Sequence, residues 1–79
     1  MSNLEKYNNA FTEVFGVDAS VLGENFTKEN TDGWDSVHQL NIIALIEESF
    51  DIMLDPEDIM EFTSWKKGQA LVSKYGVEL

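Results

Sequence analysis

The chain has 79 residues, of which 15 are acidic and 5 basic, and its formal net charge is −10. This length predicts one small domain over residues 1–79, and a hydrophobic content of 43% favours a folded core over disorder. The charge argues against binding to nucleic acid or to anionic membranes, which need clustered Lys or Arg, and the lack of cysteine excludes disulfides and thiolate ligands.

The chain starts with a predicted helix and no targeting signal. Residues 1–6 lack the basic start and the apolar run of a signal peptide, and the longest apolar run, Ile42–Ile46, is too short to cross a bilayer. We therefore expect a cytoplasmic protein without membrane insertion.

A helix is predicted from Ser2 or Asn3 to Gly16, because apolar residues recur there at helical spacing. They are Leu4, Tyr7, Phe11, Val14 and Phe15.

Residues 17–35 are predicted to form a long loop. The segment contains Gly23 and Gly33 together with several Asn and acidic residues, which is typical of irregular structure. A loop of this length in a small domain is uncommon and is often functional. Its apolar residues Val21, Leu22 and Phe26 are expected to attach it to the core.

A second helix is predicted from Ser36 or Val37 to about Phe50, and a serine is a favourable residue at a helix start. Helical spacing gives it two rows of side chains. The row expected to face the core contains Gln39, Ile42, Ile43, Ile46 and Phe50. A further apolar row continues into acids and is either covered by the long loop or open to a partner protein. It contains Val37, Leu40, Ala44, Glu47 and Glu48.

Two more helices complete the predicted fold. Asp55 as N-cap and Pro56 at the first position predict a short helix from Pro56 to about Glu61. A last helix follows Thr63 or Ser64 and ends before Gly76, with Gly68 as a weak point that costs roughly 1 kcal/mol relative to Ala. We therefore expect an all-α protein: a small four-helix bundle, monomeric, with three longer helices, a short third helix and a long loop between the first two.

Charge is unevenly distributed along the chain. The segment from Asp32 to Glu61 contains no Lys or Arg, whereas three of the four charged residues after it are lysines. Such a segment is either a solvated acidic face or a surface that attracts basic protein partners. Because the segment includes Ser36, we favour the interpretation as a surface that attracts basic partners.

Enzyme active sites find little support in the sequence. His38 is the only histidine and lies two residues from Ser36, a spacing at which helix side chains do not face each other, so we expect it to face solvent. No carboxylates are paired by spacing for acid–base catalysis, and no calcium-loop pattern fits. We predict no catalytic residues and no metal site, and weak divalent binding on the acidic face stays open.

The stretch GWDSVHQLNIIALIEESFDIMLDPEDIMEFTS resembles the core of an acyl carrier protein, and the likeness extends over essentially the whole chain. The family signature is Asp-Ser-Leu at the head of the second helix, after a Gly and a bulky residue. Asp35, Ser36 and Val37 resemble that signature and follow Gly33 and Trp34. The acidic end of the second helix, the short acidic third helix and the Thr-led last helix also match.

The resemblance implies a covalent cofactor. A separate phosphopantetheinyl transferase would attach 4′-phosphopantetheine from coenzyme A to Ser36 with the help of Mg²⁺. The thiol of this arm would carry acyl groups as thioesters for fatty-acid, polyketide or other specialised acyl biosynthesis. The chain would be no enzyme itself but a substrate and partner of acyl-loading and acyl-processing enzymes. A helix start, with its free N–H groups, is also a favourable place for the phosphate.

The resemblance also implies a docking surface for basic patches on partner enzymes. Its residues would be Asp35, Val37, Leu40, Ala44, Glu47 and Glu48. Two departures from the family pattern bear on partner choice: Val37 replaces the family leucine, and His38 and Asn41 stand where acids are frequent. A dedicated carrier for a specialised pathway is therefore at least as well supported as a general fatty-acid carrier. The alternative function is an unmodified acidic helical adaptor that acts only through protein contacts.

Overall fold

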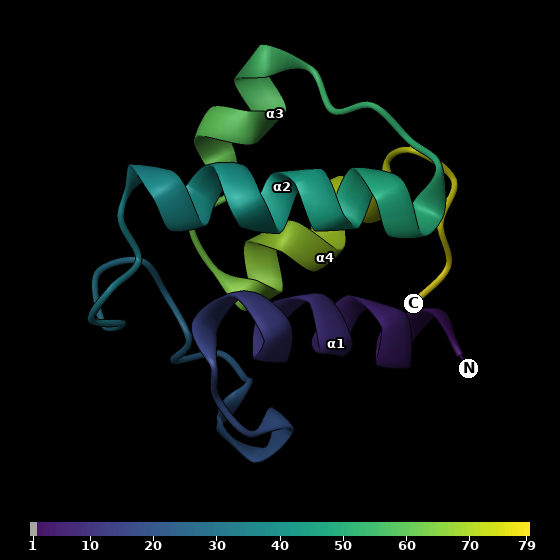
Figure 1. The fold of residues 1–79 in the computed structure, drawn as a ribbon. Coiled ribbons are helices and arrows are strands. Elements are labelled where there is room, and N and C mark those ends of the chain that lie inside the picture. Colours follow the sequence, from purple (N-terminus) through teal and green to yellow (C-terminus); the bar gives the residue numbers. More distant parts are fainter. Residues whose placement is uncertain (1) are drawn as a thin grey trace.

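The computed structural model describes residues 2–79, and within them the chain forms four α-helices, as predicted. These are α1 (Asn3–Phe15), α2 (Ser36–Phe50), α3 (Pro56–Glu61) and α4 (Trp65–Ser73), and a short 3-10 helix η1 (Ala19–Val21) interrupts the loop between α1 and α2. Figure 1 shows α1 and α2 side by side with opposite directions, α4 behind them and α3 on the side of α2 away from α1. No helix in the described part of the chain is long and apolar enough to span a membrane.

The ends of α1 and α4 follow from capping side chains. Ser2 Oγ accepts a hydrogen bond from the Glu5 N–H at 3.1 Å, and the Glu5 carboxylate accepts one from the Ser2 N–H, which together form a capping box. Gly16 ends α1 in the left-handed conformation, with φ of 65°, where an L side chain would be strained. Ser64 Oγ accepts from the Lys67 N–H at 2.9 Å and starts α4. The predicted helix ends are thus confirmed.

An aromatic cluster around Phe11 forms the centre of the core. The Phe11 ring is fully buried and lies 5.7 Å from the Phe26 ring, 6.1 Å from the Trp34 ring and 6.0 Å from the Phe62 ring. Aromatic pairs at these distances add specific edge and face contacts to the burial of apolar area. The cluster therefore joins α1, the long loop and the segment before α4. The other buried apolar residues are Tyr7, Ala10, Ile42, Ile43, Ile46, Leu54, Leu71 and Val72.

The long loop is also attached to the bundle by its backbone. The Trp65 N–H donates to Phe26 O at 2.9 Å, and the Lys28 N–H donates to Thr63 O at 2.8 Å, so the loop lies against the start of α4. Phe26 is buried and Leu22 packs partly buried against the core, as predicted. The prediction for Val21 was wrong: its side chain is 54% exposed, because η1 turns it away from the core.

α3 is attached to the end of α4 by a buried carboxylate. Asp58 is nearly completely buried, and its carboxylate accepts hydrogen bonds from Lys74 Nζ at 2.7 Å and from the Tyr75 hydroxyl. The Tyr75 oxygen in turn accepts from the Asp55 N–H at 3.0 Å. These bonds, from Lys74 first and from Tyr75 second, hold the pKa of Asp58 below its ordinary value. The cluster satisfies a carboxylate that would be costly to bury alone.

We expect the Asp58 cluster to make the protein acid-sensitive. A carboxyl whose pKa is lowered by folding stabilises the folded state fully above the ordinary aspartate value of 3.8 and loses this contribution as the pH falls through the lower folded value. Asp58→Asn should therefore lower the melting temperature at neutral pH and flatten its decline on the acid side. Melting curves across pH check this, with exposed Glu57→Gln as matched control. An Asp58→Asn protein whose melting temperature falls with decreasing pH as steeply as that of the parent protein would contradict the prediction.

Gly68 has a packing role that the sequence did not reveal. It is buried in α4, and a Cβ placed there would lie 2.2 Å from Tyr7 Oη and 2.6 Å from Phe62 Cζ. The Tyr7 hydroxyl is fixed, since it donates to Trp65 O at 2.6 Å. The expectation that Gly68 is only a weak point of its helix was therefore incomplete, because the missing side chain allows α1 and Phe62 to pack closely against α4.

Candidate attachment site at the start of α2

Ser36 is the first residue of α2, and its side chain is exposed. The N-cap is Asp35, whose Oδ1 accepts a hydrogen bond from the His38 N–H at 2.9 Å. A capping role for Ser36, which the sequence suggested, is thus taken by the residue before it. Within residues 2–79 the Ser36 hydroxyl has no hydrogen-bond partner, so it is open to a reagent from solvent.

The backbone around Ser36 rests on a buried polar network. Trp34 is buried, and its Nε1–H donates to Gln39 Oε1 at 2.6 Å. Gln39 Nε2 donates to Ile59 O at 2.9 Å and to Phe62 O at 2.8 Å, which satisfies carbonyl groups at the end of α3. Gln39 was predicted on the core face of this helix, and the structure explains why a polar residue occupies that row. These bonds join the loop, α2 and the end of α3.

His38 forms a pair with the capping carboxylate. Its Nδ1 lies 2.8 Å from Asp35 Oδ1, and its ring stacks on Phe15 of α1 with centroids 5.6 Å apart and planes 19° apart. The His38 ring, and next its backbone N–H, hold the pKa of Asp35 below the ordinary aspartate value. The expectation of a solvent-facing His38 was wrong, since the side chain is only about one third exposed (34%). The Asp-x-x-His spacing was the signal for this pair, because residues three apart on a helix are neighbours.

The hydroxyl of Ser36 is not part of a Ser–His pair. No hydrogen bond connects Ser36 with His38 in the described part of the chain, and the ring nitrogen Nδ1 is engaged by Asp35. Among residues 2–79, no group of three or more His, Cys, Asp or Glu side chains could hold a metal ion.

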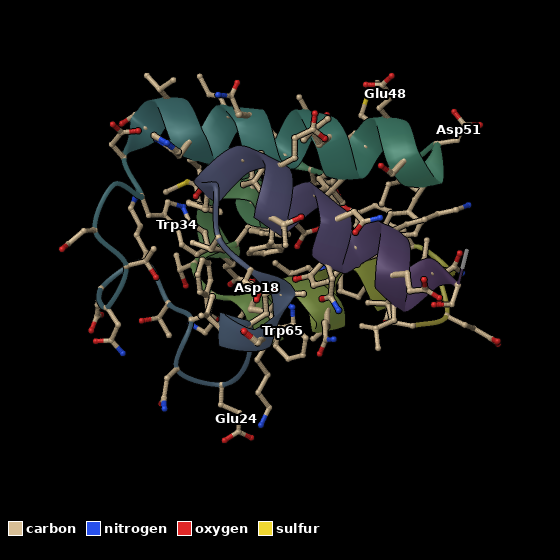
Figure 2. All side chains as sticks on the ribbon, turned by 60° about the horizontal axis from the view of Figure 1, so that its bottom comes forward. Asp18, Glu24, Trp34, Glu48, Asp51 and Trp65 are labelled. Atoms are coloured by element: carbon tan, nitrogen blue, oxygen red, sulfur yellow. The ribbon has the colours of Figure 1, made fainter. Side chains whose placement is uncertain are left out.

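The outer face of α2, defined by Val37, Leu40, Ala44, Glu47 and Glu48, is open to solvent over most of its length. Val37 is 62% exposed and Leu40 is 66% exposed, and Ala44 is exposed as well. The long loop therefore does not cover this row. Figure 2 shows Glu48 at the C-terminal end of α2, pointing away from the bundle. Glu47 is half-buried, and its Oε2 accepts from the Leu54 N–H at 2.8 Å.

Two methionines add exposed apolar surface beyond this face. Met53, before α3, and Met60, in α3, are both largely exposed. Methionine is flexible and polarizable, and such side chains adapt to differently shaped partners. The sequence placed Met60 on the third helix but gave no sign that it points outward, because a helix of six residues shows too few turns for a clear periodicity.

No protein-family model, no curated protein and no solved structure matches the chain.

Proposed function

We propose that this protein is a carrier protein that bears a covalent 4′-phosphopantetheine arm on Ser36. The observation that carries the proposal is the exposed and unbonded Ser36 hydroxyl, which directly follows the capping Asp35 at the start of α2 within the described chain. The sequence around it resembles the acyl carrier protein signature. Catalytic serines need a neighbouring base, whereas a serine that is modified by another enzyme needs only access.

The residues around Ser36 fit such a group. A phosphodiester on Ser36 Oγ would replace no hydrogen bond in the described chain and would displace no buried side chain. The His38 N–H in the first turn of α2 is not free for it, because it already donates to the Asp35 carboxylate. The phosphate would therefore share the helix start with the Asp35 carboxylate, and the arm would extend from the exposed Ser36 into solvent.

The attachment step is a phosphoryl transfer from coenzyme A on a separate transferase. Ser36 Oγ forms a bond to the phosphorus next to the pantetheine, the pyrophosphate linkage breaks, and the adenosine bisphosphate leaves. The base and Mg²⁺ of the transferase accept the proton and the developing charge. When attached, the group supplies a terminal thiol that holds acyl intermediates as thioesters. Ser36 itself contributes an accessible oxygen on a rigid helix start.

Docking of partner enzymes would use the outer face of α2. Its apolar part, Val37, Leu40 and Ala44, is exposed beside the attachment point, and Glu48 lies further along the same helix. A negative surface attracts partners with basic patches and accelerates their association. Glu47 would be less accessible to a partner than the sequence suggested, because it is half-buried and its carboxylate already accepts from the Leu54 N–H.

Attachment of the arm can be measured through the thiol at its end, because the chain contains no cysteine and therefore has no thiol of its own. We expect that incubation with coenzyme A, Mg²⁺ and a broad-specificity phosphopantetheinyl transferase gives the protein one thiol that reacts with a maleimide. Before incubation no thiol should react. The measurement is the stoichiometry of maleimide labelling after removal of free coenzyme A.

The same assay separates the carrier from the alternative of an unmodified acidic adaptor. An adaptor would stay without a thiol under conditions in which a reference carrier protein becomes fully labelled. Labelling of less than about one thiol in ten chains would count against the carrier. The exposed apolar row of α2 would then remain as a contact surface, and Leu40→Ser would be the variant with which to test it.

Partner choice is expected to depend on His38 and Asn41. These residues replace two acids near Ser36, and His38 also offsets the charge of Asp35 when it is protonated. We expect the protein to serve housekeeping fatty-acid enzymes poorly, which favours a specialised pathway. His38→Asp with Asn41→Glu should raise the rate of malonyl transfer from a housekeeping transferase roughly two- to tenfold at low salt, since exposed pairs contribute about 0–1 kcal/mol each.

Kinetics of malonyl transfer at low and moderate salt check this prediction. The gain should shrink as salt screens the added charges. The matched control is Ser49→Asp with Gln69→Glu, which adds two charges at exposed or half-exposed positions outside the outer face of α2. An unchanged rate for the first variant, or an equal gain for the control, would remove the physical basis for a specialised carrier.

A further inference from the structure

A surface hollow lies between the long loop and the start of α4. Its volume is about 420 Å³, and its lining within the described chain comes from the loop at residues 24–30 and from residues 63–67. Figure 2 shows Glu24, which lines this hollow, on the same side of the molecule as Trp65, the first residue of α4. Ser36 is not part of the lining, so the hollow is distinct from the candidate attachment site.

Backbone contacts hold the two sides of the hollow together. Thr27 of the loop and Ser64, the N-cap of α4, form an isolated antiparallel bridge. The Lys28 N–H next to this bridge donates to Thr63 O at 2.8 Å. Lys67 is three residues after Ser64 and thus lies about one helical turn further on the same side of α4. The fold therefore places the backbones of Lys28 and Lys67 at one hollow.

Positive charge gathers at this hollow, although the whole chain has a net charge of −10. Lys28 and Lys67 line it, and Lys66 forms an ion pair of 2.9 Å with Glu24, which also lines it. Glu29 is the other acid of the lining, so three lysines and two glutamates leave a net charge of +1. Within residues 2–79, Lys28 and Lys67 form no ion pair and no side-chain hydrogen bond. Their ammonium groups are therefore available to a ligand.

A buried hydroxyl adds a hydrogen-bond donor. Ser64 is only 7% exposed, and its Oγ accepts from the Lys67 N–H at 2.9 Å. The Ser64 O–H donates to no acceptor in the described part of the chain. Lys67 also borders Glu61 at a neighbouring hollow, but no ion pair joins the two side chains there. Since buried polar groups are normally hydrogen-bonded, this hydroxyl and the two lysines form a set of donors that lacks an acceptor.

We propose that the hollow binds a small doubly charged oxyanion, a phosphate monoester or a dicarboxylate, between Lys28 and Lys67. Two ammonium groups match two negative charges, and the Ser64 O–H can donate to a ligand oxygen. A lysine ammonium is a point charge with rotatable donors, so it accepts the geometry of either anion. Because both lysines are exposed, we expect an affinity in the millimolar range. This inference does not depend on an arm at Ser36.

A titration followed by ¹H–¹⁵N NMR tests the inference. The first ligand is sodium phosphate at constant ionic strength and about pH 8, where phosphate is a dianion. We expect the backbone signals of residues 27–28 and 63–67 to move and to saturate. Acetate, which has a single charge, should bind at least about threefold more weakly. Sodium malonate is the second dianion: a response to both shows that the site takes dianions in general, and a response to one of them names the class of ligand.

Charge variants separate a site from general attraction to lysines. Lys28→Gln and Lys67→Gln should each weaken phosphate binding roughly two- to fivefold, whereas Glu29→Gln should strengthen it by up to about fivefold. Lys6→Gln removes a lysine that lines another hollow and is the matched control, which should leave binding unchanged.

Four results would overturn the inference. They are signals that move without saturation for both dianions, acetate binding as tight as phosphate binding, an unchanged affinity in Lys67→Gln, and an equal loss of affinity in Lys6→Gln. Because the substituted lysines are exposed, these variants are expected to fold like the parent protein.

Discussion

Ser36→Ala is expected to abolish attachment of phosphopantetheine completely while the helical bundle stays folded. The substitution removes the oxygen that would form the phosphodiester. Because the Ser36 hydroxyl makes no hydrogen bond within the described chain and is exposed, its loss should change the free energy of unfolding by no more than about 0.5 kcal/mol. Loading is measured by intact mass, and folding by circular dichroism and thermal melting.

Ser49→Ala is the matched control for this prediction. Ser49 is also an exposed serine of α2, but it lies near the end of the helix and outside the resemblance to the carrier signature. It should load like the parent protein. Peptide mapping that finds the arm on Ser49, or on any serine other than Ser36, would contradict the assignment of the attachment point.

Gly68→Ala should be the most destabilising of the substitutions discussed here. Alanine favours a helix by about 1 kcal/mol over glycine. Against this, its Cβ would overlap Tyr7 Oη at 2.2 Å and Phe62 Cζ at 2.6 Å, and the Tyr7 hydroxyl cannot move without losing its bond to Trp65 O. Overpacking costs about 1–3 kcal/mol, and an unsatisfied buried hydroxyl costs a similar amount, so the loss outweighs the gain.

The expected fall in melting temperature is roughly 10 °C or more, because 1 kcal/mol corresponds to about 4–8 °C in a domain of this size. Gly23→Ala is the control, since a Cβ at Gly23 would have no atom within 4 Å and its φ is not positive. It should leave stability unchanged or raise it slightly. In a Tyr7→Phe background, Gly68→Ala should cost less, since the closest contact is gone. A Gly68→Ala protein as stable as the parent would contradict the packing argument.

The helices could be predicted from the sequence because local rules determine their ends. Pro56 can occupy only the first turn of a helix, and Gly16 can adopt the left-handed conformation that ends one. The bounds of α2 and α3 agree with the predicted bounds, although the C-cap of α2, Asp51, is a residue other than glycine in the left-handed conformation. The core row of α2 was also predictable, since Ile42, Ile43 and Ile46 recur at helical spacing and are all buried.

The parts that could not be predicted depend on contacts between distant segments. Gly68 looked unfavourable in its helix because only the fold brings Tyr7 and Phe62 against it. The role of Gln39 could not be predicted because its acceptors, Ile59 O and Phe62 O, belong to a distant segment at the end of α3. Val21 resembled a core residue by hydropathy alone, and the turn of η1 turns it outward.

At the candidate site, the sequence predicted Ser36 as the attachment point but missed contacts of the residues beside it. The motif pointed to Ser36, and the exposed row Val37, Leu40 and Ala44 is consistent with the predicted partner surface. The Asp35–His38 pair was not predicted, although residues three apart on a helix are neighbours. Asp35 caps α2 through the His38 N–H, and the Ser36 hydroxyl makes no hydrogen bond within the described chain.

The intact mass of the protein after incubation with coenzyme A, Mg²⁺ and a broad-specificity phosphopantetheinyl transferase tests the central claim most directly. The proposed function predicts that the whole population gains the mass of one phosphopantetheine and no more, and that Ser36→Ala gains nothing. An unchanged mass of the parent protein, in a reaction that fully loads a reference carrier protein in the same tube, would contradict it.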